Sequence, residues 1–169
     1  MTLSMYQASV PVFVRGLENL AAILAKGAAH AEAKKIDPAV FVNARLAPDM
    51  LHFARQVQIA SDAAKGCVAR LAGVEVPSFA DTETTFPELQ ARVAKTIDFL
   101  NGFKPAQIDG SEERTCILKT RTDEIRHRGQ DYLLKLALPN FLFHVTTAYD
   151  ILRHNGVELG KNDYLGKLA

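Results

Sequence analysis

The chain has 169 residues, of which 48% are hydrophobic, and its 20 Lys and Arg residues nearly balance 19 Asp and Glu residues, which leaves a formal net charge of +1. A chain of this length suits one domain, since domains typically hold ~100–200 residues, and it can bury about 68% of its unfolded surface. The balanced charge argues against a protein that binds nucleic acid or an anionic membrane, because both depend on a surplus of Lys and Arg. We therefore expect residues 1–169 to form a single domain with no nucleic-acid or membrane partner.

The cysteine content and the N-terminus indicate the compartment. Cys67 and Cys116 lie far apart without CxxC spacing, so the disulfide framework of a secreted protein is not indicated. Arg15 and Glu18 interrupt the apolar N-terminal stretch, which argues against a signal peptide. No stretch reaches the roughly 18 uncharged apolar residues of a membrane span. We expect a cytoplasmic protein.

The first predicted element is a long amphipathic helix. Apolar residues recur at helical spacing from residue 10 onward, and the helix is expected to end near Lys34 and Lys35. Its start remains open. Ser4 and Gln7 fit a capping box that precedes a bend at Pro11, whereas Ser9 can instead cap a helix with Pro11 in its first turn.

Two further helices follow. The second is predicted to begin with Pro48-Asp49 in its first turn and to end at Gly73, and its Ala- and Ser-rich apolar face allows a neighbouring helix to approach closely. Residues 74–84 show no period and are expected to form a surface loop. The third helix is predicted to start at the capping box of Thr85-Phe86-Pro87-Glu88 and to end at Asn101-Gly102.

The last third of the chain changes character. Cys116-Ile117-Leu118 and residues 125–128 have the composition and alternation of a short hairpin. A brief helix is expected at residues 131–138, and Pro139 breaks or restarts it before a last helix that ends at Asn155-Gly156. The tail is expected to lie against the body through Val157, Leu159, Tyr164 and Leu165. These elements predict an all-α four-helix bundle with a hairpin excursion between the third and fourth helices.

Motif searches exclude several enzyme classes. The chain contains no GxGxxG, GxxxxGK[ST], GxSxG or HExxH sequence, which argues against nucleotide-dependent enzymes, serine hydrolases of the usual type and zincins. Arg and Lys are spread along every segment, so neither a basic patch nor interleaved aromatic residues favour nucleic-acid binding.

Two of the five histidines lie where a bundle metal site can form. His52 stands near the start of the second helix and His144 in the last helix, and a metal site needs ligands that project inward from facing helices. At about 100° per residue, His52 points about 140° away from Val57, the centre of the apolar stripe, whereas His144 lies about 100° from Val145 at the edge of its stripe. The periodicity therefore favours exposed or structurally satisfied imidazoles over ligands.

Polar residues on the same two helices are candidates for a ligand cleft. In the last helix, His144, Tyr149 and Arg153 can supply acid, base and anion-binding groups. Alternatively, Tyr149 is a core ring with its hydroxyl at the rim, and Arg153 is a cation that suits the helix C-terminus. In the second helix, a polar set can line a pocket mouth or a solvated face: Arg55, Gln56, Gln58 and Asp62. Cys67 is expected to be a packed side chain.

Several motifs resemble an uncharacterised bacterial domain family of the DinB/YfiT-like superfamily. They are MYQASVP at residues 5–11, LAPDM at 46–50 with QVQ at 56–58, GQDY at 129–132, LPNF at 138–141, and the HVTTAYDILRHNGVELGKNDYLG tail from residue 144. The resemblance spans nearly the whole chain and implies a helical bundle that is commonly dimeric. It also implies a divalent metal held by histidines of the second and fourth helices, and some relatives are metal-dependent thiol transferases.

Carried onto this chain, the resemblance implies a degenerate metal triad of His52, Asn140 and His144, for an ion such as Zn or Ni. Asn140 stands where the family has a histidine, and an amide is a poor replacement for imidazole at a transition-metal site. We therefore expect a homodimer with an inter-helix cleft for a small-molecule ligand and no firmly bound metal. The alternative is a divalent-metal-dependent enzyme of the thiol-transferase or hydrolase type. A third possibility is a pure oligomerisation module with a large apolar dimer face and no cleft.

Overall fold

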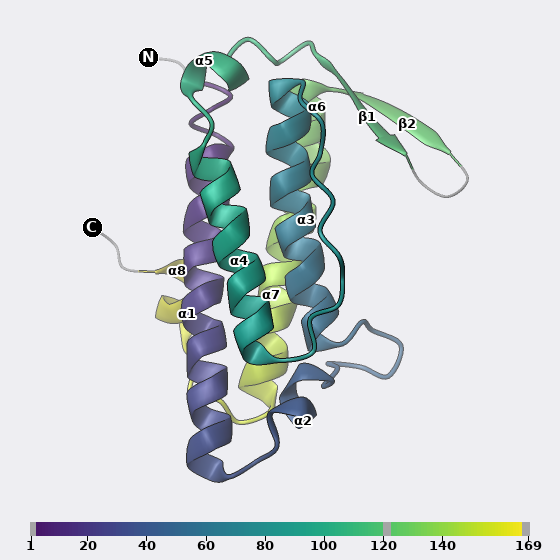
Figure 1. The fold of residues 1–169 in the computed structure, drawn as a ribbon. Coiled ribbons are helices and arrows are strands. Elements are labelled where there is room, and N and C mark those ends of the chain that lie inside the picture. Colours follow the sequence, from purple (N-terminus) through teal and green to yellow (C-terminus); the bar gives the residue numbers. More distant parts are fainter. Residues whose placement is uncertain (1–2, 120–122, 167–169) are drawn as a thin grey trace.

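Four long helices form the body of the chain. The computed structural model describes residues 3–119 and 123–166, and within this part α1 (Val10–Lys34), α3 (Phe53–Ala72), α4 (Phe86–Asn101) and α7 (Leu138–His154) lie side by side (Figure 1). Helix α4 packs against α1 and α3, and α7 packs mainly against α3. The chain is mostly helical and carries one small antiparallel hairpin, so it is not strictly all-α.

The structure resolves the two alternatives for the start of the first helix. Helix α1 begins after Ser9, with Pro11 in its first turn. Ser4 and Gln7 nevertheless make the reciprocal bonds of a capping box, because the backbone N–H of each donates to the side chain of the other, at 3.2 and 3.3 Å. The predicted capping box therefore caps a separate turn at residues 5–9, before α1 begins. Helix α1 ends at Lys34, as predicted.

The prediction for the start of the second helix is wrong by about one turn. The short helix α2 (Pro38–Val42), which we did not predict, begins where the Asp37 side chain accepts a hydrogen bond from the Ala39 backbone. An irregular segment then leads to α3, which starts only at Phe53 with His52 as its N-cap. The predicted end is confirmed, since Gly73 takes a left-handed conformation at φ 71° and closes the helix.

Local capping chemistry fixes the third long helix. The Thr85 side chain accepts from the Glu88 backbone, and the Glu88 carboxylate accepts from the backbone N–H groups of Thr85 and Thr84, at 3.0 and 2.7 Å. This is the predicted capping box, and α4 ends at Asn101 as expected. A single turn, α5 (Pro105–Ile108), then closes the end of the body.

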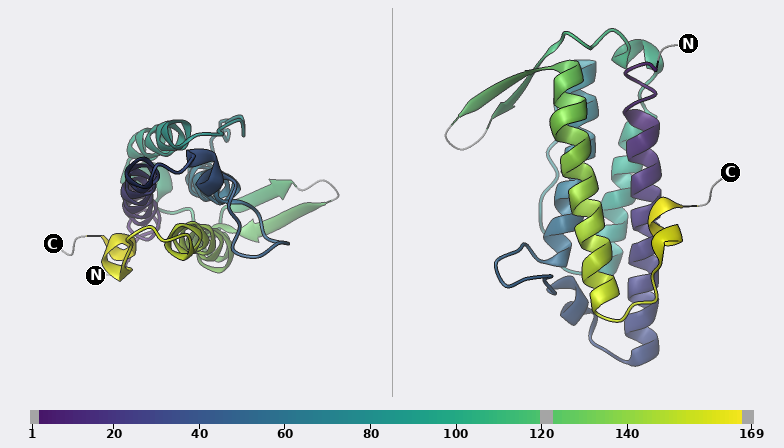
Figure 2. Two further views of the ribbon diagram at one scale, coloured as in Figure 1. Left: turned by 90° about the horizontal axis from the view of Figure 1, so that it is seen from below. Right: turned by 180° about the vertical axis from the view of Figure 1, so that it is seen from behind.

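The predicted hairpin is confirmed and projects from the body (Figure 2). Strand β1 (Thr115–Lys119) pairs antiparallel with β2 (Glu124–Arg128), in a register that places Ile117 opposite Arg126. The segment between the two predicted strands falls partly on residues 120–122, outside the described residues. Where β1 meets α3, the Arg70 guanidinium donates to the Ile117 carbonyl and to the Tyr132 hydroxyl.

Pro139 does not interrupt the last helix, contrary to our expectation of a break or restart. Helix α6 (Gly129–Tyr132), the π-helical turn η1 (Leu133–Ala137) and α7 follow one another directly, and Pro139 lies in the first turn of α7. Proline lacks an N–H and crowds the carbonyl of the preceding helical turn. A π turn is wider than an α turn, so η1 accommodates the Pro139 ring next to that carbonyl and the helix stays continuous.

One cluster of buried apolar side chains runs between the long helices. Gly16 of α1 permits close packing, because a Cβ atom built there would lie 2.6 Å from Cε1 of Phe141. The tail returns along α1 through buried Val157 and Leu159 and ends in α8 (Lys161–Leu165), although Leu165 itself is exposed. Among the described helices, none has the length and apolar character needed to cross a membrane.

Candidate functional site

His144 meets Gln56 where α7 packs on α3. The Nδ1 atom of His144 lies 2.7 Å from Oε1 of Gln56, while the Gln56 amide nitrogen donates to the Leu51 carbonyl at 2.9 Å. The Leu51 contact orients the amide, so its oxygen faces the ring and His144 must carry its proton on Nδ1. The free lone pair of His144 is therefore on Nε2. The residue is only 8% exposed, and burial together with the charge of Arg55 lowers its pKa, which favours the neutral ring.

His52 has a different role, as the N-cap of α3. Its Nδ1 accepts the Arg55 backbone N–H at 3.3 Å. The proton of the neutral ring is then on Nε2, so the ring donates there and its one lone pair is used by the helix cap. Burial, followed by the charges of Arg45 and Arg55, lowers the pKa of His52. The ring is half-buried. Because a cap residue lies outside the helix, the direction of the His52 ring does not follow the helical spacing that we used to predict it.

The donor set does not fit a firmly bound divalent ion. Asn140 is half-buried in the first turn of α7, one turn before His144. Of the three predicted ligands, only His144 keeps a free imidazole lone pair, because His52 uses its own in the cap and Asn140 offers a neutral amide oxygen. Across residues 3–119 and 123–166, no group of three or more His, Cys, Asp and Glu side chains is placed to hold a metal ion.

The other predicted cleft residues lie on separate faces of α7. Tyr149 packs edge-on against Tyr164 of α8, with ring centroids 6.2 Å apart, and Arg153 is exposed in the last turn. At about 100° per residue, these side chains point about 140° and 180° away from His144. Of the predicted cleft residues, the structure thus brings Gln56 to His144 and directs Tyr149 and Arg153 elsewhere.

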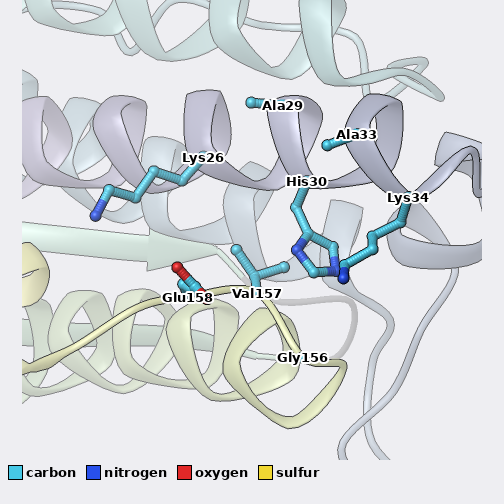
Figure 3. Close-up of a pocket in the computed structure, with 8 residues that line it drawn as sticks. All are labelled: Lys26, Ala29, His30, Ala33, Lys34, Gly156, Val157 and Glu158. Carbon is cyan, nitrogen blue, oxygen red and sulfur yellow. The ribbon is translucent and has the colours of Figure 1, made fainter.

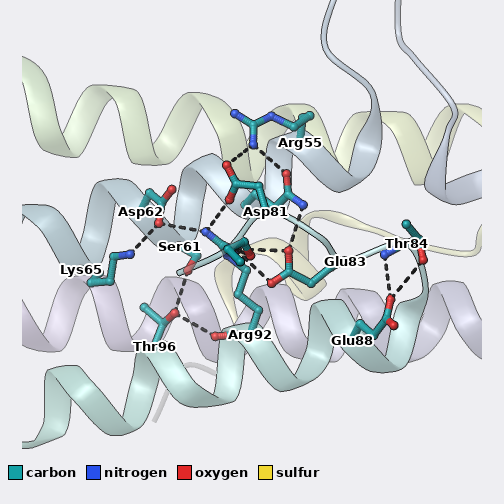
Figure 4. A network of polar contacts seen from close by, with 12 residues as sticks. Arg55, Ser61, Asp62, Lys65, Asp81, Glu83, Thr84, Glu88, Arg92 and Thr96 are labelled. Carbon is teal, nitrogen blue, oxygen red and sulfur yellow. Dashed lines mark hydrogen bonds and ion pairs between the residues drawn. The ribbon is translucent and has the colours of Figure 1, made fainter. Parts of the chain in front are cut away.

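The most extensive polar arrangement in the described part of the chain includes Arg55 and Asp62 of the predicted polar set, but the sequence did not lead us to expect their partners. It is the Arg92 network, in which the linker between α3 and α4 (residues 74–84) is tied to both helices (Figure 4). Arg92, whose side chain is 1% exposed, contacts Asp62 at 2.9 Å, Asp81 at 3.0 Å and Glu83 at 3.0 Å. The network comprises three cations and three carboxylates: Arg55, Lys65, Arg92, Asp62, Asp81 and Glu83.

Cation–π contacts anchor the same linker at a second point. The ring of Phe79 lies 3.9 Å from Nζ of Lys65 and 4.1 Å from Nζ of Lys95, with the Arg92 guanidinium at 5.7 Å. Such contacts are attractive because the face of an aromatic ring is electron-rich. The linker therefore does not behave as the plain surface loop that its composition suggested.

A cavity of about 250 Å³ lies between this linker and the start of α3. His52, Arg55 and Gln58 face it from α3, and Asp81 belongs to its opposite wall; the remaining lining residues are Val42, Asn43, Ala54, Thr82, Glu83 and Thr84. The cavity combines a guanidinium, the Nε2–H of a neutral imidazole, amides and hydroxyl groups. Both of its carboxylates, Asp81 and Glu83, already accept bonds from Arg92.

A second, more open hollow of about 470 Å³ lies between the C-terminal half of α1 and the segment after α7 (Figure 3). Lys26, His30, Lys34 and Glu158 line it together with small residues. Lys26 pairs with Asp163 at 2.7 Å, and the His30 ring packs edge-on against Phe41. Two of its polar groups are therefore already engaged in packing the tail and α2.

Both cysteines are packed inside the body, as expected for Cys67. Cys67 and Cys116 are buried and unbridged. Burial raises the pKa of each thiol above its ordinary value, so the reactive thiolate form is disfavoured. Neither side chain is suited to be a nucleophile.

Comparisons with known proteins extend over nearly the whole chain. A family described as "Domain of unknown function (DUF1993)" matches residues 5–165. A crystal structure of a DinB family member protein from Shewanella denitrificans is 45% identical in sequence with a TM-score of 0.90, and the match covers 96% of this chain and 92% of that one. Among curated proteins, none matches the chain.

Proposed function

Since this chain belongs to the DUF1993 family and to the DinB-like proteins, we propose that it binds a small polar ligand in the cavity beside His52 and Arg55, without a firmly bound metal. The observation that carries the proposal is the commitment of the His52 lone pair to the cap of α3. The position from which DinB-like proteins are expected to supply a metal ligand instead presents an N–H donor to a cavity.

The cavity supports a ligand rich in hydrogen-bond acceptors. His52 Nε2–H, the Arg55 guanidinium and the Thr82 hydroxyl can donate into it, whereas the Thr84 hydroxyl already donates to Glu88 at 3.3 Å. Ligand sites combine a concave shape with a few polar groups that fix orientation. At about 250 Å³, this cavity suits a small metabolite.

A metal-dependent enzyme of the thiol-transferase or hydrolase type is the alternative, and one observation favours it. Gln56 fixes the Nδ1–H of His144 and leaves Nε2 free, and metal-bound histidines are commonly oriented by such a second hydrogen bond. This alternative requires His52 to release the helix cap and Asn140 to act as a ligand.

The two candidate functions differ in a metal assay. The protein, purified without a histidine tag or chelator, is analysed for Zn, Ni, Mn and Fe, next to His144→Ala and the matched control His154→Ala, whose histidine is exposed at the end of α7. We expect substoichiometric metal in all three. Stoichiometric metal that is lost in His144→Ala and kept in His154→Ala would establish the alternative.

A thermal-shift screen with small polar metabolites tests ligand binding itself. A compound that binds in the cavity of the folded chain raises Tm, by an amount that grows with its concentration relative to its Kd. Arg55→Gln should abolish that shift, whereas Arg153→Gln, which changes an exposed arginine of α7, should leave it intact. A shift that survives Arg55→Gln would place the ligand elsewhere.

We also propose that the protein is a homodimer that uses the outward face of η1 and α7. Leu134, Leu142 and Phe143 are exposed on these two elements, Phe143 to 55%. In the right-hand view of Figure 2, no other described segment passes in front of their ribbon. Exposed apolar patches commonly mark protein interfaces. Light scattering coupled to size exclusion should give twice the monomer mass for the wild type and the monomer mass for Phe143→Ser. A dimer that binds no compound in the screen would favour the pure oligomerisation module.

The cytoplasm is the compartment that we propose. Two buried thiols without a disulfide suit a reducing environment. Cell fractionation of the tagged protein tests this, and recovery in a membrane or secreted fraction would contradict it.

A further inference from the structure

Asp81 occupies a site formed by two arginines from different helices. One of its carboxylate oxygens contacts Arg55 of α3 at 2.5 Å, and the other contacts Arg92 of α4 at 3.0 Å. Figure 4 shows the carboxylate between the two side chains. We infer that Arg55 and Arg92 form a carboxylate-binding site, that Asp81 fills it as an internal ligand, and that a monocarboxylate entering the adjoining cavity displaces Asp81.

Asp81 is the replaceable member of the Arg92 network. It belongs to the linker, which has no regular structure, and its side chain is 37% exposed. Asp62, by contrast, is fixed on α3, and Glu83 is only 14% exposed and also accepts from Gln58 at 2.9 Å. Asp81 is therefore the carboxylate that a movement of the linker alone can withdraw without exposing a buried charge.

Of the two arginines, Arg55 is the one that an external carboxylate in the cavity can reach. Arg55 and Asp81 both line it, so a ligand in the cavity already lies beside the contact that it must replace. Arg55 has Asp81 as its carboxylate partner and Gln58 as its neutral partner. Paired guanidinium groups favour a planar carboxylate because both of its oxygens can accept a bond.

Charge balance selects a monoanion. The network holds equal numbers of cations and carboxylates. The departure of Asp81 therefore leaves the network with one excess positive charge beside the nearly buried guanidinium of Arg92. A single carboxylate restores the balance, whereas phosphate carries more than one negative charge near pH 7. Arg92 also has a buried Nε–H without a hydrogen-bond partner in the described part of the chain, so the network has donor capacity to spare.

Displacement of Asp81 frees only part of the linker. Phe79 remains held by Lys65 and Lys95, and Thr84 remains bonded to Glu88 at the start of α4. Between these anchors, the Ala80 carbonyl still accepts from Arg92 at 3.0 Å, and Glu83 keeps its contacts to Arg92 and Gln58. The part of the linker that moves when a carboxylate binds is therefore residues 81 and 82.

The test rests on the proposed cavity and uses propionate and inorganic phosphate as probes, with the full-length protein at constant ionic strength. We expect NMR titration to show propionate binding that Arg55→Gln abolishes. Asp81→Asn, which removes the internal competitor but keeps the shape, should tighten propionate binding at least about tenfold, because apparent affinity is reduced by the fraction of protein in the closed state. Glu75→Gln, an exposed carboxylate of the same linker outside the network, should not change the affinity.

Hydrogen exchange of the wild-type protein gives a readout that does not depend on any variant. Saturating propionate should speed exchange at residues 81 and 82 and leave α3 and α4 unchanged. Unchanged linker exchange, equal affinity of wild type and Asp81→Asn, absence of propionate binding, or a preference for phosphate would each overturn the inference. Failure of the proposed function looks different, since then no compound in the thermal-shift screen binds in a manner that depends on Arg55.

Discussion

Replacement of Arg92 by Met tests whether the network that ties the linker to α3 and α4 stabilises the fold. The variant keeps an apolar side chain of similar length but removes contacts to Asp62, Asp81 and Glu83. Removal of one partner from a buried ion pair costs about 3–5 kcal/mol. Asp62 and Asp81 are 41% and 37% exposed, so water recovers part of their solvation and we expect a loss of about 2–4 kcal/mol.

Urea denaturation followed by circular dichroism measures this loss, and thermal unfolding should show a Tm lower by about 5–15 °C for a chain of this size. Arg126→Met is the matched control, because Arg126 forms an exposed pair with Glu124 at 2.7 Å and should change stability by at most about 0.5 kcal/mol. An Arg92→Met protein within about 0.5 kcal/mol of wild type would refute the view that the network stabilises the linker against the helices.

Two further predictions concern packing and pH. Gly16→Ala places a Cβ atom 2.6 Å from the Phe141 ring and should destabilise the protein by about 1–3 kcal/mol. The control Gly160→Ala should be tolerated, because nothing lies within 4 Å of its Cβ position. Equal urea midpoints for the two variants would contradict the close packing of Gly16 against Phe141. The pKa of His144 in the folded protein lies below the ordinary value of 6.5, so between these values the unfolded chain binds more protons and stability should decline as pH falls below about 6.5. His52 acts in the same direction, so His144→Gln should weaken, but not remove, the fall in unfolding free energy between pH 7 and pH 5. An unaltered pH profile in His144→Gln would contradict the lowered pKa of His144.

Sequence predicts the fold well where a helix end is decided by neighbouring residues. The capping box of Thr85 and Glu88 and the left-handed Gly73 act within one turn of the chain, so their effect is visible in the sequence. The start of α3 and the continuity through Pro139 are different, because they depend on an irregular segment and on a π turn whose fit is settled by packing. Periodicity alone cannot locate such features.

The candidate site was harder to predict because its contacts join distant parts of the chain. Gln56 and His144 are 88 positions apart, and nothing local to either residue indicates the other. The Arg92 network did leave a signal. Arg92 and Thr96 follow Leu89 at helical spacing, so they share a face with a core residue, and a charged residue on such a face needs partners. The acidic residues of the linker were the available partners.

The role of His52 follows from where α3 begins, and it can be tested directly. In a helix that started at Pro48-Asp49, His52 would be an interior residue with a free ring, whereas as N-cap it satisfies the Arg55 backbone N–H. Aspartate is among the best N-cap residues and also suits the positive end of the helix dipole. His52→Asp should therefore keep the wild-type stability, while His52→Ala should lose about 1 kcal/mol in urea denaturation. Equal losses in the two variants would show that the imidazole, and not the cap, is what position 52 contributes.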